Sequence, residues 1–178
     1  MNRFVIAEPQ NCIGCRTCEV ACAMAHSSAH GAEPLNPDNF MPRLSVVKNE
    51  SVSTVALCRH CEDAPCANAC PSGAIVYRND SVQVIQERCV GCKSCMVACP
   101  YGAMRIVSVP APQTGLIKSR ATRAQALKCD LCENREQGPA CVAACPTHAL
   151  QLVDAARMEA ALKQRQLLAA QGMPNVTL

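Results

Sequence analysis

Sixteen cysteines carry most of the chemistry that this chain of 178 residues could perform. They form four blocks of four, with no cysteine left over, and three of the blocks end in Cys-Pro. The first and third blocks have the spacing C-x2-C-x2-C-x3-C, which holds [4Fe–4S] clusters in bacterial ferredoxins. At four thiolates per cluster, the sequence predicts four [4Fe–4S] clusters. The blocks are Cys12, Cys15, Cys18, Cys22; Cys58, Cys61, Cys66, Cys70; Cys89, Cys92, Cys95, Cys99; and Cys129, Cys132, Cys141, Cys145.

The spacing also predicts which cysteines share a cluster. In two-cluster ferredoxins the fourth cysteine of each block ligates the cluster of the other block. Blocks two and three, separated by a hairpin-length spacer, then form one pair, and blocks one and four form the other by elimination. The predicted ligand sets are Cys12, Cys15, Cys18 and Cys145 for cluster 1; Cys58, Cys61, Cys66 and Cys99 for cluster 2; Cys89, Cys92, Cys95 and Cys70 for cluster 3; and Cys129, Cys132, Cys141 and Cys22 for cluster 4.

Zinc binding is an alternative use of some of these cysteines. Structural zinc sites use two separated C-x2-C pairs, a pattern that blocks one and three do not show; zinc stays an alternative at block two or block four alone. No Gly-rich phosphate loop, Ser/His/Asp set or pair of carboxylates is legible, so we predict no catalytic residue. The four histidines near the blocks are expected to support ligands or to be exposed: His26, His30, His60 and His148.

Composition supports a fold built around inorganic groups. The chain has two Phe, two Tyr and no Trp, so it lacks the large side chains that fill most cores. Metal sites supply folding energy in such chains, and we expect the apoprotein to be largely unfolded. The formal charge is +3. Four clusters at about −2 each add about −8, so the charge does not indicate a nucleic-acid partner.

The expected location follows from what the sequence lacks. The N-terminus has no apolar leader segment and no twin-arginine pair, and no stretch reaches 18 apolar residues. We therefore expect a cytoplasmic chain without direct membrane insertion. A reducing compartment also suits thiolate ligands better than disulfides.

Short strands and turns are expected between the blocks. Strands are predicted at residues 3–7, 44–47, 52–57, 103–109 and 149–153, and a hairpin at 74–77 and 82–85 with a polar four-residue turn. The Pro-rich segment 110–128 is predicted to be a linker that becomes helical near block four. Residues 154–171 are predicted to form a helix with Asp154 as its cap and Gly172 as its stop. Its weak apolar stripe is expected to pack against its own domain.

These elements predict an α+β fold of two ferredoxin-like dicluster modules, with small β-hairpins and short helices around four [4Fe–4S] clusters. Residues 1–50 and 110–153 would form an outer module with blocks one and four. Residues 51–109 would form an inner module with blocks two and three, and residues 154–178 a C-terminal helix and tail.

The cysteine motifs carry a family resemblance. CIGCRTCEVAC, CRHCEDAPCANACPSGAI, CVGCKSCMVACPYGAM and KCDLCENREQGPACVAACPTHAL resemble the four-cluster electron-transfer subunits of the dimethyl sulfoxide reductase iron–sulfur family. The short chain and its MNRF start are similar to small cytosolic members associated with formate dehydrogenase and formate hydrogenlyase. The polyferredoxin subunit of tungsten aldehyde oxidoreductase is also similar.

The resemblance implies a non-catalytic subunit that relays single electrons. Its partners would be a molybdenum- or tungsten-pterin catalytic subunit and a second redox subunit (a hydrogenase, a flavin subunit or a ferredoxin), in a hetero-oligomer. The alternative hypothesis is an iron–sulfur accessory or maturation factor for such an enzyme. A redox sensor is disfavoured because no DNA-binding helix pair is legible.

Overall fold

The computed structural model describes residues 1–27, 34–111 and 122–172. Within these ranges every sheet has two antiparallel strands, which lie among short helices. This mixture of helix and strand agrees with the predicted class. The strand pairs are β1 (Phe4–Ala7) with β8 (Leu150–Val153), β2 (Ser45–Lys48) with β3 (Ser53–Ala56), β4 (Ile75–Arg78) with β5 (Ser81–Val84), and β6 (Arg105–Pro110) with β7 (Thr122–Leu127).

The helices are short except at the two ends of the chain. Pro65 occupies the first helical position of α2, where its missing N–H costs no hydrogen bond. The helices are α1 (Thr17–Ser27), α2 (Pro65–Asn68), α3 (Ser94–Ala98), α4 (Ala140–Ala143), α5 (Ala155–Ala170) and the 3-10 turn η2 (Gln86–Arg88). The first four α-helices each contain at least one cysteine of a block.

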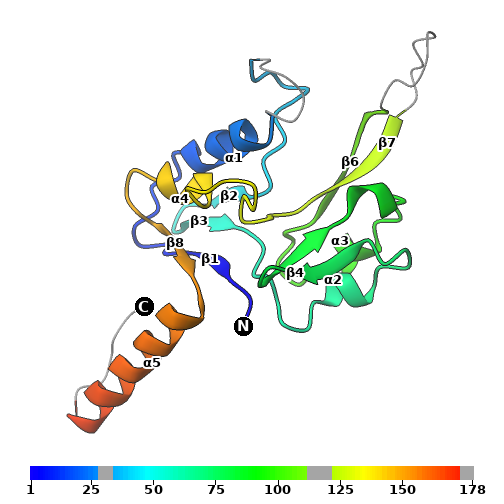
Figure 1. Ribbon diagram of the computed structural model, residues 1–178. Helices are drawn as coiled ribbons and strands as arrows, with labels where there is room; N and C mark the ends of the chain where they lie inside the picture. The colour runs from blue at the N-terminus through cyan, green and yellow to red at the C-terminus, as the bar shows by residue number, and fades with distance from the viewer. Residues whose placement is uncertain (28–33, 112–121, 173–178) are drawn as a thin grey trace.

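Buried side chains gather in two separate cores. The first core lies among β1, β3, β8, α1 and α4 on the left of Figure 1, and the second among α2, α3 and the β4–β5 and β6–β7 pairs on the right. Cysteines belong to both, in keeping with the scarcity of aromatic residues. The first core contains Val5, Cys18, Cys22, Leu44, Val55, Leu57, Leu131, Cys141 and Leu150; the second contains Ala64, Cys66, Ile75, Val82, Cys95, Met104 and Ala126.

The pairing of β1 with β8 joins the two ends of the cysteine-rich chain. Phe4 lies opposite Val153 and Ala7 opposite Leu150. Because the first block follows β1 and the last block precedes β8, this pair brings blocks one and four to the same side of the molecule. Helices α1 and α4 lie next to each other there (Figure 1).

The hairpin of β4 and β5 has a tighter turn than predicted. Arg78 pairs with Ser81, which leaves a two-residue loop in place of the predicted four-residue turn. Asn79 and Asp80 both have φ near +51°, the left-handed conformation of a type I′ turn. Asn and Asp tolerate this conformation because their short side chains bond the local backbone.

The prediction of helix near the end of segment 110–128 is wrong. Residues 122–127 form β7, which pairs with β6 from Thr122–Pro110 to Leu127–Arg105. The run TRAQAL has weak β propensity, but β6 offers unpaired backbone groups, and burial of Ala126 and Leu127 favours pairing. Residues 112–121, the middle of the predicted linker, lie outside the described residues.

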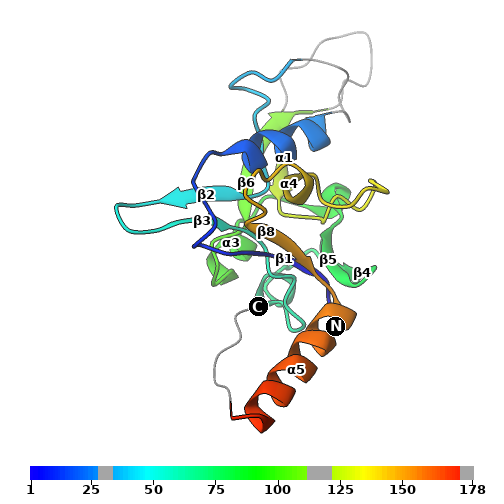
Figure 2. The same ribbon diagram turned by 90° about the vertical axis from the view of Figure 1, so that its left-hand side faces the viewer.

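Helix α5 forms as predicted but does not pack as predicted. The Asp154 carboxylate accepts the N–H of Arg157 at 2.8 Å, and Gly172 takes a left-handed φ of +72° just after the helix. No residue of α5 is buried, and the helix projects away from both cores (Figure 2). Its apolar residues are too few and too scattered to form a face that a core could cover. Within the described part of the chain, no helix has the length and apolarity that a membrane span needs.

Candidate iron–sulfur centres

Four cysteines of the second core surround one small cavity. Cys58 and Cys61 lie in the loop before α2, Cys66 lies on α2, and Cys99 follows α3; together they line about 330 Å³ of partly open space. They are the residues predicted to bind cluster 2. Four thiols facing one space between separate segments are the donor set that a [4Fe–4S] cluster requires.

Two further cavities repeat this arrangement. Each measures about 320 Å³, including space open to solvent, and is close to the first in size. The repeated size and the four cysteines at each place fit one kind of group at all three. One cavity is lined by Cys12, Cys15, Cys18 and Cys145, the set predicted for cluster 1, and the other by Cys70, Cys89, Cys92 and Cys95, the set predicted for cluster 3.

The remaining cysteines meet between α1 and α4. The Cys141 thiol interacts electrostatically with the thiols of Cys129, Cys22 and Cys132, the set predicted for cluster 4. Burial raises the pKa of Cys129 to about 12 and raises that of Cys141 still further. Such thiols deprotonate readily only when a metal replaces the proton, so this set also suits iron.

Glycine is required in the ligand loops for two reasons. Gly14 and Gly91, inside blocks one and three, have φ values of +69° and +72°, which favour glycine. A Cβ on Gly91 would also lie 2.3 Å from the Ala124 Cβ of β7. The β6–β7 pair therefore lies directly against the third ligand loop.

Hydroxyl groups contact the sulfurs of the first and third sets, a feature that the sequence analysis did not single out. The Thr17 hydroxyl donates to Cys15 Sγ at 3.3 Å, and Ser94 lies 3.5 Å from Cys92 Sγ. These contacts are the main reason for the lowered pKa of both thiols. Each hydroxyl stands two residues after its cysteine. The same spacing places Ser72 3.6 Å from Cys70 Sγ and Thr147 3.7 Å from Cys145 Sγ.

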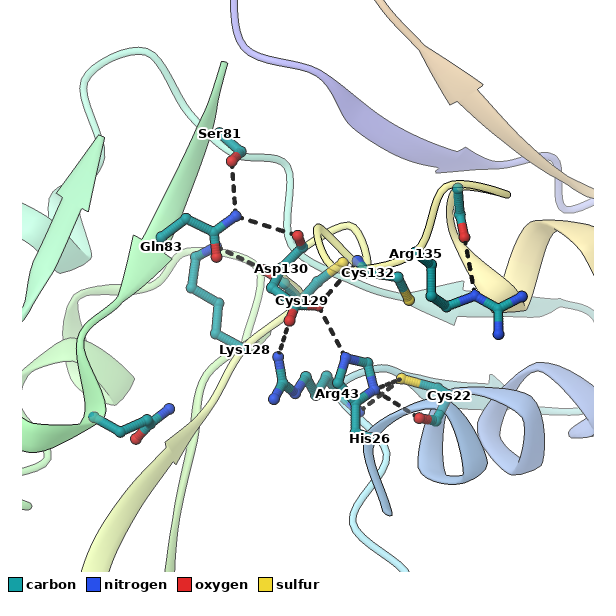
Figure 3. A network of polar contacts seen from close by, with 12 residues as sticks. Cys22, His26, Arg43, Ser81, Gln83, Lys128, Cys129, Asp130, Cys132 and Arg135 are labelled. Carbon is teal, nitrogen blue, oxygen red and sulfur yellow. Dashed lines mark hydrogen bonds and ion pairs between the residues drawn. The ribbon is translucent and has the colours of Figure 1, made fainter. Parts of the chain in front are cut away.

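A charged network surrounds the fourth set (Figure 3). His26 Nε2 lies 3.0 Å from Asp130 Oδ1, and Arg43 Nη1 lies 2.5 Å from Asp130 Oδ2. The backbone N–H of Cys132 donates to Asp130 Oδ1 at 3.0 Å, while that of Arg43 donates to Cys22 Sγ at 3.3 Å. One carboxylate therefore ties α1, the segment before β2 and block four together.

The same contacts set the protonation of this network. Burial alone would lower the pKa of His26, but its hydrogen bonds to Asp130 and Cys22 raise that pKa to about 9. Burial alone would raise the pKa of Asp130. The hydrogen bond from His26 and the charge of Arg43 nevertheless hold the pKa of Asp130 well below its usual range. His26, Asp130 and Cys132 are close enough to hold an ion. The ion pairs already satisfy the histidine and the carboxylate, so no separate metal is needed to explain them.

The histidines near the blocks differ in their surroundings. His26 and His60 belong to polar networks in the protein, whereas His148 is exposed and His30 lies outside the described residues. His60 lines the cavity of Cys58, Cys61, Cys66 and Cys99 together with Lys128. The cysteine spacing did not indicate a role for Asp130 or Lys128. Each is a charged residue next to Cys129, and nothing in the sequence around it distinguishes it from a surface residue.

Cavities lined by four cysteines on a ferredoxin-like arrangement of hairpins and short helices define an iron–sulfur electron-transport protein. The chain belongs to the family described as "4Fe-4S dicluster domain", which matches residues 50–155, and a "4Fe-4S binding domain" matches residues 9–25. The first match includes blocks two, three and four, which favours iron–sulfur clusters over zinc at blocks two and four.

Similar proteins are named for electron transport or as oxidoreductases and their subunits. Electron transport protein HydN of Escherichia coli K12 is 55% identical over 161 residues, covering 89% of this chain and 92% of HydN. Formate hydrogenlyase subunit 2 of the same strain is 46% identical over 175 residues, covering 86% of this chain and 83% of that subunit. The putative oxidoreductase AegA, also of that strain, is 48% identical over 170 residues, covering 96% of this chain and 25% of AegA.

Proposed function

We propose that the sixteen cysteines hold four [4Fe–4S] clusters in the ligand sets given above, and that the protein relays single electrons between two redox partners. A [4Fe–4S] cluster bound by four thiolates supplies one-electron oxidation and reduction. The thiols lie in four groups of four, and all sixteen are free of disulfides. This supports the assignment of every cysteine as a ligand.

Contacts between the ligand sets support a linear order of 1–4–2–3. The Cys141 thiol of set 4 interacts with Cys18 of set 1. The Cys129 thiol of set 4 interacts with Cys58 of set 2. Sets 2 and 3 are joined by α2, which carries Cys66 of set 2 and ends next to Cys70 of set 3. In this order sets 1 and 4 belong to the outer module, and sets 2 and 3 belong to the inner module. The two modules would then meet where set 4 lies next to set 2.

The boundaries of these modules are also part of the proposal: residues 1–50 with 110–153, residues 51–109, and residues 154–178. Packing crosses the first two boundaries. Val55 and Leu57 pack in the core of the outer module, and Ala126 packs in the core of the inner module. Strand β3 of the inner module would therefore pack in the outer core, and strand β7 of the outer module in the inner core. This packing would fix the position of one module relative to the other.

The exposure of the cysteines is the observation that carries this function. Of the sixteen, only Cys15 and Cys92 are exposed, and they belong to sets 1 and 3, the two ends of the proposed order. The cysteines of sets 4 and 2 are buried or partly buried. A route that is accessible at both ends and covered in the middle suits the transfer of electrons from one partner to another.

The partners proposed are a molybdenum- or tungsten-pterin oxidoreductase of the formate dehydrogenase or aldehyde oxidoreductase type and a second redox protein (a hydrogenase, a flavin subunit or a ferredoxin). Two similar proteins support a hetero-oligomer. One is by name a subunit of formate hydrogenlyase. In AegA, a sequence similar to almost this whole chain makes up a quarter of a longer putative oxidoreductase.

Anaerobic purification of the native complex tests the proposal. We expect about sixteen Fe per chain, together with stoichiometric recovery of a partner that contains molybdenum or tungsten. A content near eight Fe would refute the four-cluster assignment. Sixteen Fe in a chain that is recovered without any partner would favour the alternative function, an accessory or maturation factor.

A further inference from the structure

Lys128 is a buried cation without a carboxylate partner. Its side chain is covered on all sides, and only 3% of the residue is exposed. Its Nζ donates to the carbonyl oxygens of Val82 and of Cys129, the latter at 2.9 Å. None of the ion pairs in the described part of the chain includes it. A buried ammonium requires opposite charge nearby, because carbonyl dipoles alone compensate only part of the lost hydration.

The histidine beside Lys128 does not supply that charge. His60, 1% exposed, lies with its Nδ1 3.5 Å from the Lys128 ammonium, and the same Nδ1 accepts the N–H of Val82 at 3.0 Å. Nδ1 is therefore the acceptor, and the ring proton sits on Nε2, which has no hydrogen-bond partner among the described residues. A ring with its proton on Nε2 and an accepting lone pair on Nδ1 is neutral, so it does not balance the charge of Lys128.

The position of Lys128 indicates where the missing charge lies. Lys128 and His60 both line the cavity of Cys58, Cys61, Cys66 and Cys99, and Lys128 directly precedes Cys129 of set 4. Lys128 therefore lines the cavity of set 2 and contacts the backbone of set 4, and Figure 3 shows it beside Cys129.

We propose that Lys128 is the shared counter-cation of clusters 2 and 4, and that its charge makes both easier to reduce than they would otherwise be. The inference rests on the ligand sets proposed above. Each four-thiolate cluster carries about −2 when oxidised and gains one more negative charge on reduction, so a buried cation favours the reduced state. The effect is large because little water screens charges inside the protein. The unpartnered Nε2–H of His60 would add a neutral donor on the side of cluster 2.

Anaerobic redox titration of the full-length holoprotein, followed by electron paramagnetic resonance, tests this proposal. In Lys128→Gln, which keeps a hydrogen-bond donor but loses the charge, we expect two of the four clusters to have a reduced-to-oxidised ratio about tenfold lower at a given potential. For a one-electron couple this equals about 59 mV. Lys128→Arg, which keeps the charge, should titrate like the wild type. Lys163→Met on exposed α5 is the control and should also titrate like the wild type.

The outcomes distinguish an effect of the charge of Lys128 on the clusters from an effect of its shape. Unchanged potentials in Lys128→Gln, or an equal shift in all four clusters, would overturn the proposal. Iron loss in both Lys128→Gln and Lys128→Arg would also overturn it, because the site would then need the shape of lysine and not its charge. Iron loss in Lys128→Gln alone supports it. Wild-type protein with fewer than four clusters would instead refute the proposed function, so the two failures are distinguishable.

Discussion

Replacing Asp130 by alanine should weaken the fourth cysteine set selectively. The Asp130 carboxylate binds His26, Arg43 and the N–H of Cys132. Because the pKa of His26 is raised to about 9, that ring is cationic at neutral pH. Asp130→Ala therefore leaves Arg43 without its counter-charge, removes the partner that keeps His26 protonated, and removes an acceptor from the loop that carries Cys132.

The contacts allow an estimate of the cost. A hydrogen bond to a charged group contributes about 1.5–3 kcal/mol, and breaking a buried ion pair costs about 3–5 kcal/mol. The three side chains are 16–22% exposed, so water replaces part of what is lost. We expect Asp130→Ala to destabilise the closed loop by about 3 kcal/mol. Asp130→Asn keeps one acceptor oxygen, replaces the other by an NH2 donor and loses the charge, and should cost about 1.4 kcal/mol.

The assay is release of iron from anaerobic holoprotein to a chelator. When reclosing is faster than chelation, the release rate follows the opening equilibrium. About 3 kcal/mol then corresponds to roughly 150-fold faster release, and about 1.4 kcal/mol to tenfold. Only about a quarter of the iron should be affected, because one of the four proposed clusters lies beside Asp130.

One control variant and the pH dependence make this prediction refutable. Asp63 is an exposed carboxylate of block two that accepts a hydrogen bond from Asn68, and Asp63→Ala should leave the release rate unchanged. Equal rates for Asp130→Ala and the wild type would refute the reasoning. The pH dependence gives a second test. The folded-state pKa of His26 lies above its ordinary 6.5, so its contribution is complete below pH 6.5 and is lost as the pH rises through 9. The difference between Asp130→Ala and the wild type should narrow over that interval.

Three further predictions concern the ligand loops and the C-terminal helix. Gly91→Ala should destabilise the holoprotein by about 2 kcal/mol more than Gly102→Ala, because both glycines have positive φ but, of the two, Gly91 alone lacks space for a Cβ. The loss of cluster absorbance on heating measures the stability of each variant. Equal destabilisation by the two substitutions would contradict the prediction. Thr17→Val should lower the reduced-to-oxidised ratio of the cluster bound by Cys15 about three- to tenfold, or about 30–59 mV, whereas Thr17→Ser should not change it. A redox titration measures both variants. If both match the wild type, the hydroxyl contact does not affect the potential of this cluster. A chain that ends before Asp154 should keep all its iron and stay within about 1 kcal/mol of full-length stability, because no residue of α5 is buried; iron loss on truncation would show that α5 supports the cores.

Local signals in the sequence predicted the local structure. The polar residues between the two β-branched runs predicted the β4–β5 hairpin, and Asp154 predicted the start of α5. These signals act over a few residues, so no knowledge of the rest of the chain is needed to interpret them.

Features that depend on distant partners could not be predicted in this way. The run TRAQAL became a strand because β6 lies beside it, and nothing within the run indicates that partner. The apolar residues of α5 indicated a packed face, but the cores close without them. Asp130 and Lys128 look like surface residues in the sequence. Lys128 became buried and Asp130 partly buried because block four returns between α1 and β5, as shown by the Asp130–His26 contact and the Lys128–Val82 contact.

The sequence by itself determined the chemistry of this protein: sixteen thiols at spacings that suit [4Fe–4S] clusters, and too few large side chains to fold around anything else. Only the tertiary structure decided the arrangement of that chemistry. It exposed Cys15 and Cys92, covered the other cysteines, and brought Lys128 between two ligand sets. The physical reason is the distance along the chain over which each feature is determined. Ligand geometry within a block is set by neighbouring residues, whereas burial and charge compensation are set by segments that meet only when the chain folds.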